Sequence, residues 1–191
     1  PLLEALPPLS TLADSKDSAG AARAYGQRQG RQLAALGVNL NFGPVVDLRP
    51  ARGGEDRLSN IAARAIASEP GRVVEIAGAY LDGLNDHGVR GTLKHFPGLG
   101  RVRGDTHLHP ARLAAGLGEL ASDWQPFRQL ASHPGAAIML GHVVLPAVDP
   151  EQAVSHSRSV VQTILRQQWN YRGVLITDDL NMGAVYPLGI G

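Results

Sequence analysis

The chain has 191 residues, and its 18 Lys and Arg residues against 17 Asp and Glu residues give a formal net charge of +1. This near balance excludes a nucleic-acid-binding module built on a concentrated basic face. Hydrophobic residues make up 43 % of the chain, which suffices for a packed core and excludes a disordered chain. The chain has no cysteine, which excludes disulfides and thiolate metal sites, and no apolar run reaches the roughly 18 residues of a membrane span.

The predicted elements alternate along the chain between helices, whose apolar residues recur about every 3.6 residues, and short apolar strands. Residues 1–12 are interrupted by prolines and predict an entry loop. A first helix is expected to have Asp14 or Ser15 as its N-cap and to end at Gly37. Its buried side is expected to carry Ala22, Tyr25, Leu33 and Leu36. Residues 38–47 predict the first strand.

The rest of the chain continues this alternation after a polar loop over residues 48–60. Three more helices are expected: one over residues 69–86, one that begins after an N-cap at Asp123, and one that begins at Ser157 or Ser159. Three more strands are expected over residues 89–95, 136–144 and 173–177. The order α-β-α-β-α-β-α-β predicts a parallel sheet with right-handed crossovers. Because the strands are almost entirely apolar, both faces of this sheet are expected to be covered. A complete eight-unit barrel needs about 250 residues, more than this chain has.

Ionisable residues stand at the end of every predicted strand, namely Asp47, Lys94-His95, His142 and Asp178-Asp179. The C-terminal ends of parallel strands meet at one rim, where α/β enzymes carry their active sites. Buried charge is costly, so stability does not account for four such ends, and the pattern indicates a functional site. Asp179 is interpreted as a cap or local partner of the following segment rather than as a catalytic group.

A long glycine-rich loop follows the second strand and contains the sequence Asp105-Thr106-His107. A carboxylate two residues before a histidine can accept a hydrogen bond from one imidazole nitrogen. The other nitrogen is then left for proton transfer. Taken alone, the same pattern is also compatible with a solvated loop.

Other side chains admit several interpretations. Lys94 can form a Schiff base or donate hydrogen bonds to substrate hydroxyls. His95, His107 and His142 with an aspartate resemble a hydrolase metal set, but their spacing matches no known zinc motif, so no metal and no cofactor are expected. Trp124 and Trp169 have helical core spacing and are interpreted as packing residues.

Five segments together resemble glycoside hydrolase family 3: residues 37–47 (GVNLNFGPVVD), 94–98 (KHFPG), 105–107 (DTH), 141–143 (GHV) and 176–182 (ITDDLNM). They occur in the family's order, and the DTH segment is similar to a loop of its β-N-acetylglucosaminidase branch. The resemblance implies a TIM (β/α)8-barrel fold and a retaining mechanism. It matches Asp178 with the nucleophile, His107 with the general acid/base, and Asp105 with the partner of that histidine.

The resemblance also implies a substrate and its contacts. Arg64, Lys94 and His95 match residues that bind the sugar, and Asp47 and His142 are added as expected substrate-binding residues. The implied substrate is a terminal β-linked N-acetylglucosamine, in bacteria on muropeptides from cell-wall recycling, which implies a cytoplasmic enzyme. Neither a nucleic acid nor a membrane is expected as a partner.

This chain also departs from the family pattern. Leu99 stands where the family's KHFPGHG segment has its second histidine, and residues 64–67 (RAIA) replace RSFG. Both changes are expected to alter substrate fit without removing the catalytic pair. Residues 1–191 are expected to form one catalytic barrel domain that is shortened at both ends and holds the central four of eight βα units. The alternative is a non-catalytic fragment or pseudo-enzyme that binds sugar or a complementing chain, and self-association is open.

Overall fold

The computed structural model describes residues 5–50, 60–102 and 106–185. Its centre is a parallel sheet of β1 (Thr92–Phe96), β3 (Ala137–Leu140) and β6 (Leu175–Thr177), in that order across the sheet. Residues 38–47 run parallel to β1 on its other side, through isolated bridges between Leu40 and Arg90 and between Val45 and Lys94. The predicted succession of four parallel segments is confirmed, although the first of them forms bridges rather than a continuous strand.

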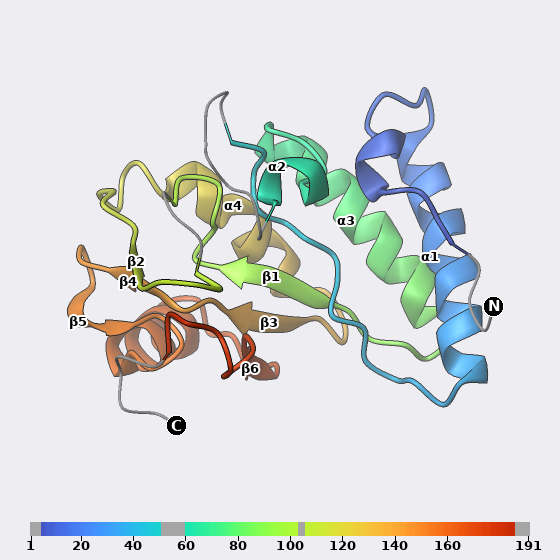
Figure 1. Cartoon of the computed structure of the whole chain (residues 1–191). Helices are drawn as coiled ribbons and strands as arrows, with labels where there is room; N and C mark the ends of the chain where they lie inside the picture. The colour runs from blue at the N-terminus through green and yellow to red at the C-terminus, as the bar shows by residue number, and fades with distance from the viewer. Residues whose placement is uncertain (1–4, 51–59, 103–105, 186–191) are drawn as a thin grey trace.

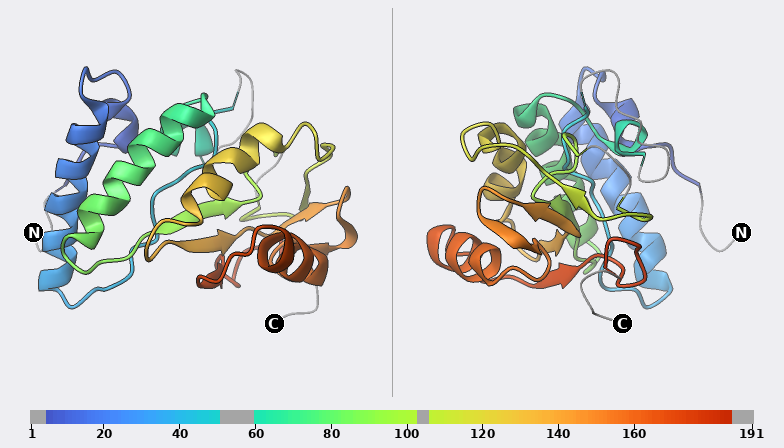
Figure 2. Two further views of the ribbon diagram at one scale, coloured as in Figure 1. Left: turned by 180° about the vertical axis from the view of Figure 1, so that it is seen from behind. Right: turned by 60° about the vertical axis from the view of Figure 1, so that its left-hand side comes forward.

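The helices alternate with these segments as the sequence predicts (Figure 1). They are α1 (Ser18–Ala35), α3 (Pro70–Asn85), α4 (Ala121–Leu130) and a π-helix, η2 (Ser159–Gln168). Figure 2 shows α3 between α1 and α4, and both neighbours contact it. The close approach of α1 to α3 depends on glycine, because a side chain at Gly26 would collide with the carbonyl oxygen of Tyr80.

Three details of the predicted helices are wrong. Asp17 caps α1 by accepting a hydrogen bond from the backbone N–H of Gly20, so the cap lies two to three residues later than expected. Leu36 is 47 % exposed because it lies beyond the last turn of α1. Asp123 lies within the first turn of α4 rather than at its cap. Two short elements were not predicted, the 3₁₀-helix η1 (Leu9–Leu12) and α2 (Ile61–Arg64).

The predicted strand over 136–144 is two strands in two sheets. After β3 the chain passes through Gly141 and His142 and continues as β4 (Val143–Leu145), which pairs with β2 (Ala111–Arg112) and β5 (Asp149–Ala153). Figure 1 shows this small sheet beyond the arrowhead of β1. The division of the strand lets the peptide of Gly141 bond to Phe96 while the following residues leave the central sheet.

The expectation of a sheet covered on both faces holds for β1 and β3 but is wrong for β6. All three residues of β6 are half-buried, and the adjacent Val174 is 58 % exposed. Within the described residues β6 has a strand neighbour on one side only, which leaves part of its surface open. No helix in the described ranges is long and apolar enough to cross a membrane. The predicted loop over 48–60 lies largely outside the described residues, which omit 51–59.

Candidate active site

Asp47 and His95 form the buried centre of the candidate site. Asp47 has no exposed surface, and its carboxylate accepts hydrogen bonds from the backbone N–H of His95 at 3.1 Å and of Leu99 at 2.9 Å. The same carboxylate lies 2.7 Å from Nδ1 of His95. A carboxylate oxygen only accepts, so Nδ1 carries the proton of this contact. Asp47 therefore ties the end of residues 38–47 to the end of β1 and sets the orientation of the His95 ring.

Arg64 reaches the same histidine from α2. Its Nη2 lies 3.5 Å from Nε2 of His95. Because Nδ1 of His95 already donates to Asp47, Nε2 is the accepting nitrogen of the neutral ring, and Arg64 is the donor. From the sequence, Arg64 was expected at the site only because of the resemblance to glycoside hydrolase family 3. The helix α2 has only four residues, which is too short for a periodic pattern to predict it.

Lys94 experiences the charges of both Arg64 and Asp178. Burial and, next, the positive charge of Arg64 lower the pKa of Lys94, while the negative charges of Asp178 and Asp47 oppose this effect. These interactions place Asp178, which follows β6, near the ammonium group at the end of β1. The structure thus brings Asp47, Lys94, His95 and Asp178 to one rim, as the strand ends predict, and adds Arg64 from α2.

Replacing Lys94 by methionine is expected to separate function from stability. The lowered pKa of Lys94 means that the folded protein disfavours its charge, so an apolar side chain of similar length removes a cost of folding. We expect kcat/KM for the reaction that this rim catalyses to fall by about 10²-fold, as when one electrostatic contact to a reacting group is removed. The thermal midpoint at neutral pH is expected to stay the same or rise.

The control for this substitution is methionine at Lys16, the chain's other lysine, which is exposed. Lys16→Met is expected to change neither activity nor thermal midpoint. A Lys94→Met variant that unfolds at a clearly lower temperature than the wild-type protein would contradict the interpretation of Lys94 as a functional charge.

Asp178 and Asp179 follow β6 directly and lead into a turn that the N–H of Met182 closes on the carbonyl of Asp179. The backbone N–H of Asp178 donates to the carbonyl of Leu140 in the neighbouring strand at 3.0 Å, and the N–H of Asp179 donates to Oδ1 of Asp178 at 2.9 Å. Oδ1 of Asp179 instead accepts from the backbone and side-chain nitrogens of Asn181 at 2.9 and 3.2 Å. The interpretation of Asp179 as a local partner is confirmed, and Asp178 is the carboxylate left half-buried at the rim.

The loop with His107 lies beside the segment that follows Asp178. The carbonyls of His107 and Thr106 accept hydrogen bonds from the backbone N–H groups of Gly183 and Ala184 at 2.8 and 3.2 Å. A side chain at Gly183 would meet the backbone of residues 107 and 108, so the glycine allows this close approach. The side chain of His107 is exposed. Asp105, its expected partner, lies outside the described residues.

His142 is buried, with 2 % of its surface exposed, and both of its ring nitrogens have partners. Nδ1 lies 2.7 Å from Oγ of Ser155, and Nε2 lies 3.1 Å from the backbone carbonyl oxygen of Asp179. The sequence analysis missed Ser155 and its neighbour His156. A histidine 13 residues from its partner, across the turn between β4 and β5, leaves no pattern in the sequence that would identify the pair.

The residues that depart from the family pattern are part of the core. Leu99 is 7 % exposed, and Ala65 and Ile66 are buried, with their carbonyls accepting hydrogen bonds from Arg49. Leu99 still contributes its backbone N–H to Asp47. The side chains at these positions therefore act through packing around the site, and that indirect action is how we expect them to alter substrate fit.

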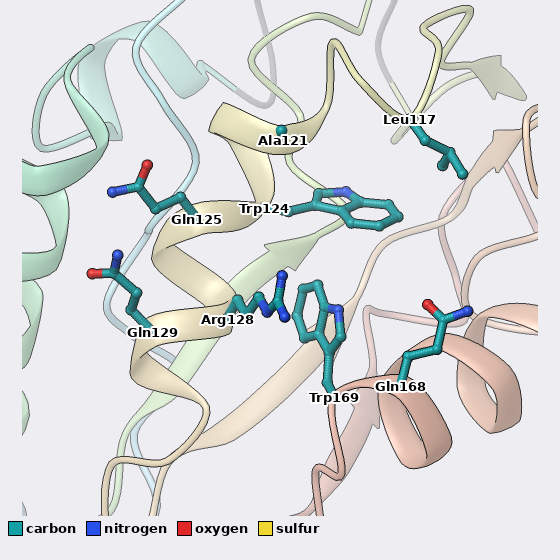
Figure 3. A pocket seen from close by; sticks show the side chains of 8 residues that line it. All are labelled: Leu117, Ala121, Trp124, Gln125, Arg128, Gln129, Gln168 and Trp169. Atoms are coloured by element: carbon teal, nitrogen blue, oxygen red, sulfur yellow. The ribbon is translucent and has the colours of Figure 1, made fainter.

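A cavity of about 570 Å³ lies between α4 and η2, away from the candidate site residues (Figure 3). Trp124 and Trp169 line it, and their ring centroids are 5.7 Å apart in an edge-to-face arrangement. Each indole also lies 5.5 Å from the ring of Phe96 at the end of β1. These contacts confirm the interpretation of both tryptophans as packing residues.

Within residues 5–50, 60–102 and 106–185, no three His, Asp or Glu side chains are grouped so that they could hold a metal ion. The described rim instead offers one half-buried carboxylate, an ammonium, a guanidinium and a histidine held by a carboxylate. This set can stabilise charge on a polyhydroxylated substrate and supply a nucleophile.

A family model described as "Glycosyl hydrolase family 3 N terminal domain" matches residues 3–189 of this chain. The β-hexosaminidase of Xanthomonas axonopodis pv. citri is 40 % identical over 177 residues, which cover 92 % of this chain and 51 % of that protein. The chain thus spans about half the length of the curated relatives it matches.

Solved structures of similar proteins also match nearly all of this chain, and the chain again covers about half of each. Native NagZ from Neisseria gonorrhoeae has a TM-score of 0.84 and 34 % identity, over 94 % of this chain and 53 % of that one. The β-N-acetylhexosaminidase of Beutenbergia cavernae has a TM-score of 0.88 and 27 % identity, over 98 % of this chain and 56 % of that one.

Proposed function

Because this chain belongs to glycosyl hydrolase family 3, we propose that it carries the catalytic residues of a β-N-acetylhexosaminidase. The observation that carries the proposal is the common rim of Asp178, Lys94 and Arg64, at which the charges of Asp178 and Arg64 both act on Lys94. The β-hexosaminidase name of its curated relatives supports the substrate class. The expected substrate is a glycan that ends in β-linked N-acetylglucosamine.

The proposed reaction is a double displacement with retention. An oxygen of Asp178 bonds to the anomeric carbon while the glycosidic C–O bond breaks, and protonated His107 gives its proton to the leaving oxygen. In the second step neutral His107 takes a proton from water, whose oxygen bonds to the anomeric carbon and releases Asp178. The negative charge of Asp178 acts on the ammonium of Lys94, and we propose that this attraction orients the attacking carboxylate.

A histidine suits the acid/base role because its ordinary pKa of about 6.5 allows both proton donation and proton removal near neutrality. The backbone contacts of His107 and Thr106 with residues 183 and 184 support this assignment, since they hold the loop beside the segment that carries Asp178. Asp105 is proposed as the acceptor that fixes the tautomer of His107. The glycines of this loop would let it close over substrate and withdraw for product release.

Replacing His107 by alanine is expected to slow poor leaving groups far more than good ones. We expect a loss of about 10²–10⁴-fold for an alkyl or disaccharide substrate, whose oxygen needs a proton, and little loss in bond cleavage for a dinitrophenyl glycoside. The measurement is kcat/KM against leaving-group pKa, in the protein expressed from its complete gene. His109→Ala, at an exposed position of the same loop, is the control and should resemble the wild-type protein. Equal losses across all leaving groups would contradict the acid/base role.

We further propose that the four parallel segments are the central four βα units of a (β/α)8 barrel and that residues 1–191 belong to one catalytic domain. The similarity to structures about twice as long supports this arrangement. Muropeptides released during cell-wall recycling are the proposed natural substrate, and an enzyme of that kind would act in the bacterial cytoplasm.

A direct test is to trap the covalent intermediate. A fluorinated N-acetylglucosaminyl analogue with a good leaving group forms the glycosyl-enzyme faster than water removes it, and peptide mass spectrometry then locates the adduct. We expect the adduct on the peptide that contains Asp178. An active enzyme with its adduct on another carboxylate would overturn the assignment.

The exposed apolar residues favour a second candidate, a fragment that binds sugar or a complementing chain. Phe42 and Leu180 are 56 % and 48 % exposed, and Val174 is more exposed still. Size-exclusion chromatography and an activity assay on the 191-residue chain separate the two candidates. An inactive chain that binds N-acetylglucosamine would support the second, whereas turnover by the chain alone would support the first.

A further inference from the structure

Three polar side chains form a continuous chain of contacts behind the candidate nucleophile. Nδ1 of His156 lies 2.8 Å from Oγ of Ser155, which lies 2.7 Å from Nδ1 of His142. Nε2 of His142 lies 3.1 Å from the carbonyl oxygen of Asp179. The two imidazole rings are stacked, with centroids 5.9 Å apart and an angle of 25° between their planes.

The direction of each hydrogen bond from His156 to Asp179 follows from the last contact, between His142 and the carbonyl of Asp179. A backbone carbonyl only accepts, so Nε2 of His142 must carry a proton and donate it to Asp179. In the neutral ring Nδ1 of His142 is then an acceptor, so the hydroxyl of Ser155 donates to it. Because the proton of the Ser155 hydroxyl is used in the bond to His142, its oxygen can only accept a second hydrogen bond. Nδ1 of His156 is therefore the donor to this oxygen. The two histidines therefore hold opposite tautomers.

The electrostatics of the cluster agree with a neutral His156 ring. Burial and, next, the charge that His142 would carry lower the pKa of His156. A second proton on His142 would turn Nδ1 into a donor. The Ser155 hydroxyl would then have to donate to Nδ1 of His156, and the tautomer of His156 would be reversed.

This hydrogen-bond chain ends on the carbonyl of Asp179, the residue whose own N–H bonds to the Asp178 carboxylate. The carbonyl of Asp179 accepts from His142 and also from the N–H of Met182 at 3.2 Å, while the N–H of Asp179 donates to Oδ1 of Asp178. Fixing the Asp179 residue at its carbonyl thus restrains the donor that orients the Asp178 carboxylate. Asp178 is also anchored through its own N–H to Leu140, so the carboxylate is held from two sides.

We propose that His156, Ser155 and His142 are positioning residues, which act in sequence to hold the Asp178–Asp179 turn in its reactive geometry. This role replaces the expected contact of His142 with substrate, because both of its ring nitrogens bind protein atoms. The kinetic consequence rests on the proposed function, in which Asp178 is the nucleophile. The tautomer of His142 does not rest on it.

The first experiment therefore measures the tautomer. In the wild-type protein, long-range ¹H–¹⁵N NMR of imidazole-labelled histidine is expected to give His142 with its proton on Nε2 and His156 with its proton on Nδ1. Ser155→Ala removes the donor to Nδ1 of His142, so the ¹⁵N shift of Nδ1 is expected to move to that of an imidazole nitrogen without a hydrogen bond, while Nε2 keeps its proton for the carbonyl of Asp179. Ser155→Thr keeps the hydroxyl and is expected to restore the wild-type shift. A wild-type His142 protonated on Nδ1, or an unchanged ring in Ser155→Ala, would overturn the proposal.

The second experiment measures kcat and KM separately for an aryl β-N-acetylglucosaminide, in the protein from the complete gene. Ser155→Ala is expected to lower kcat about 10–100-fold, the usual effect of losing a group that orients a reacting residue, with KM little changed. Ser155→Thr is expected to recover most of kcat. A loss in KM alone would contradict a positioning role.

Ser157→Ala is the matched control. Ser157 is a fully buried serine two residues away, and its hydroxyl donates to Asp149 at 2.7 Å rather than to a histidine. This variant is expected to lower stability while leaving the His142 tautomer and kcat unchanged, and an equal loss of kcat in both variants would overturn the proposal. If the wild-type protein hydrolyses no aryl glycoside, the proposed function fails while the NMR result still decides the hydrogen-bond chain.

Discussion

Alanine at Asp178 is expected to abolish hydrolysis of an aryl β-N-acetylglucosaminide, with a fall in kcat of about 10⁴-fold or more. Asp178 is the proposed nucleophile, so its removal eliminates the covalent intermediate rather than weakening one contact. Its setting supports this large effect. The carboxylate is half-buried at the end of β6, bonded at Oδ1 by the N–H of Asp179 and within the field of Lys94.

Two further measurements make this result specific. Asp179→Asn, the matched change at the adjacent carboxylate, is expected to keep most of the activity, because its Oδ1 serves only Asn181. Azide is expected to restore turnover of an activated substrate by Asp178→Ala, since a small anion can enter the space left by the carboxylate and attack the anomeric carbon. Unchanged turnover by Asp178→Ala, or a loss of similar size in Asp179→Asn, would refute the nucleophile assignment.

Alanine at Asp47 is expected to reduce the free energy of unfolding by about 3–5 kcal/mol, because it leaves buried donors without their charged acceptor. The donors are the backbone N–H groups of His95 and Leu99 and Nδ1 of His95. The same change frees the His95 ring, so activity is expected to fall even where the variant remains folded. Urea unfolding at a temperature where both proteins are folded measures the first effect.

Asp47→Asn separates the two roles of this residue. Asparagine keeps one accepting oxygen for the backbone donors but presents no second carboxylate oxygen to Nδ1 of His95. We expect a smaller loss of stability than with alanine and a loss of activity that remains large. A fully stable and fully active Asp47→Ala variant would show that the buried contacts of Asp47 matter neither to the fold nor to the site.

Much of this fold could be predicted from the sequence because each element carries its own local pattern. The buried side chains of α3 recur at helical spacing, and the strand β3 is a short run of four buried apolar residues. The points at which the prediction is wrong are those that local pattern does not record. Nothing in residues 136–144 shows that the strand divides at Gly141 and His142, because the division is made by contacts with Phe96, Ser155 and Asp179.

The sequence by itself determined the parallel α/β order and the chemical groups at the strand ends, because hydrophobic periodicity and the polarity of strand termini are local properties. Only the tertiary structure decided which of those groups are buried against protein partners and which stay at the rim. Asp47 and His142 are buried and have protein partners 48 and 37 residues away, whereas Asp178 and Lys94 are half-buried at the rim. Contacts between residues so far apart in the sequence depend on how the strands align. This alignment is set by packing across the whole sheet rather than by any single segment.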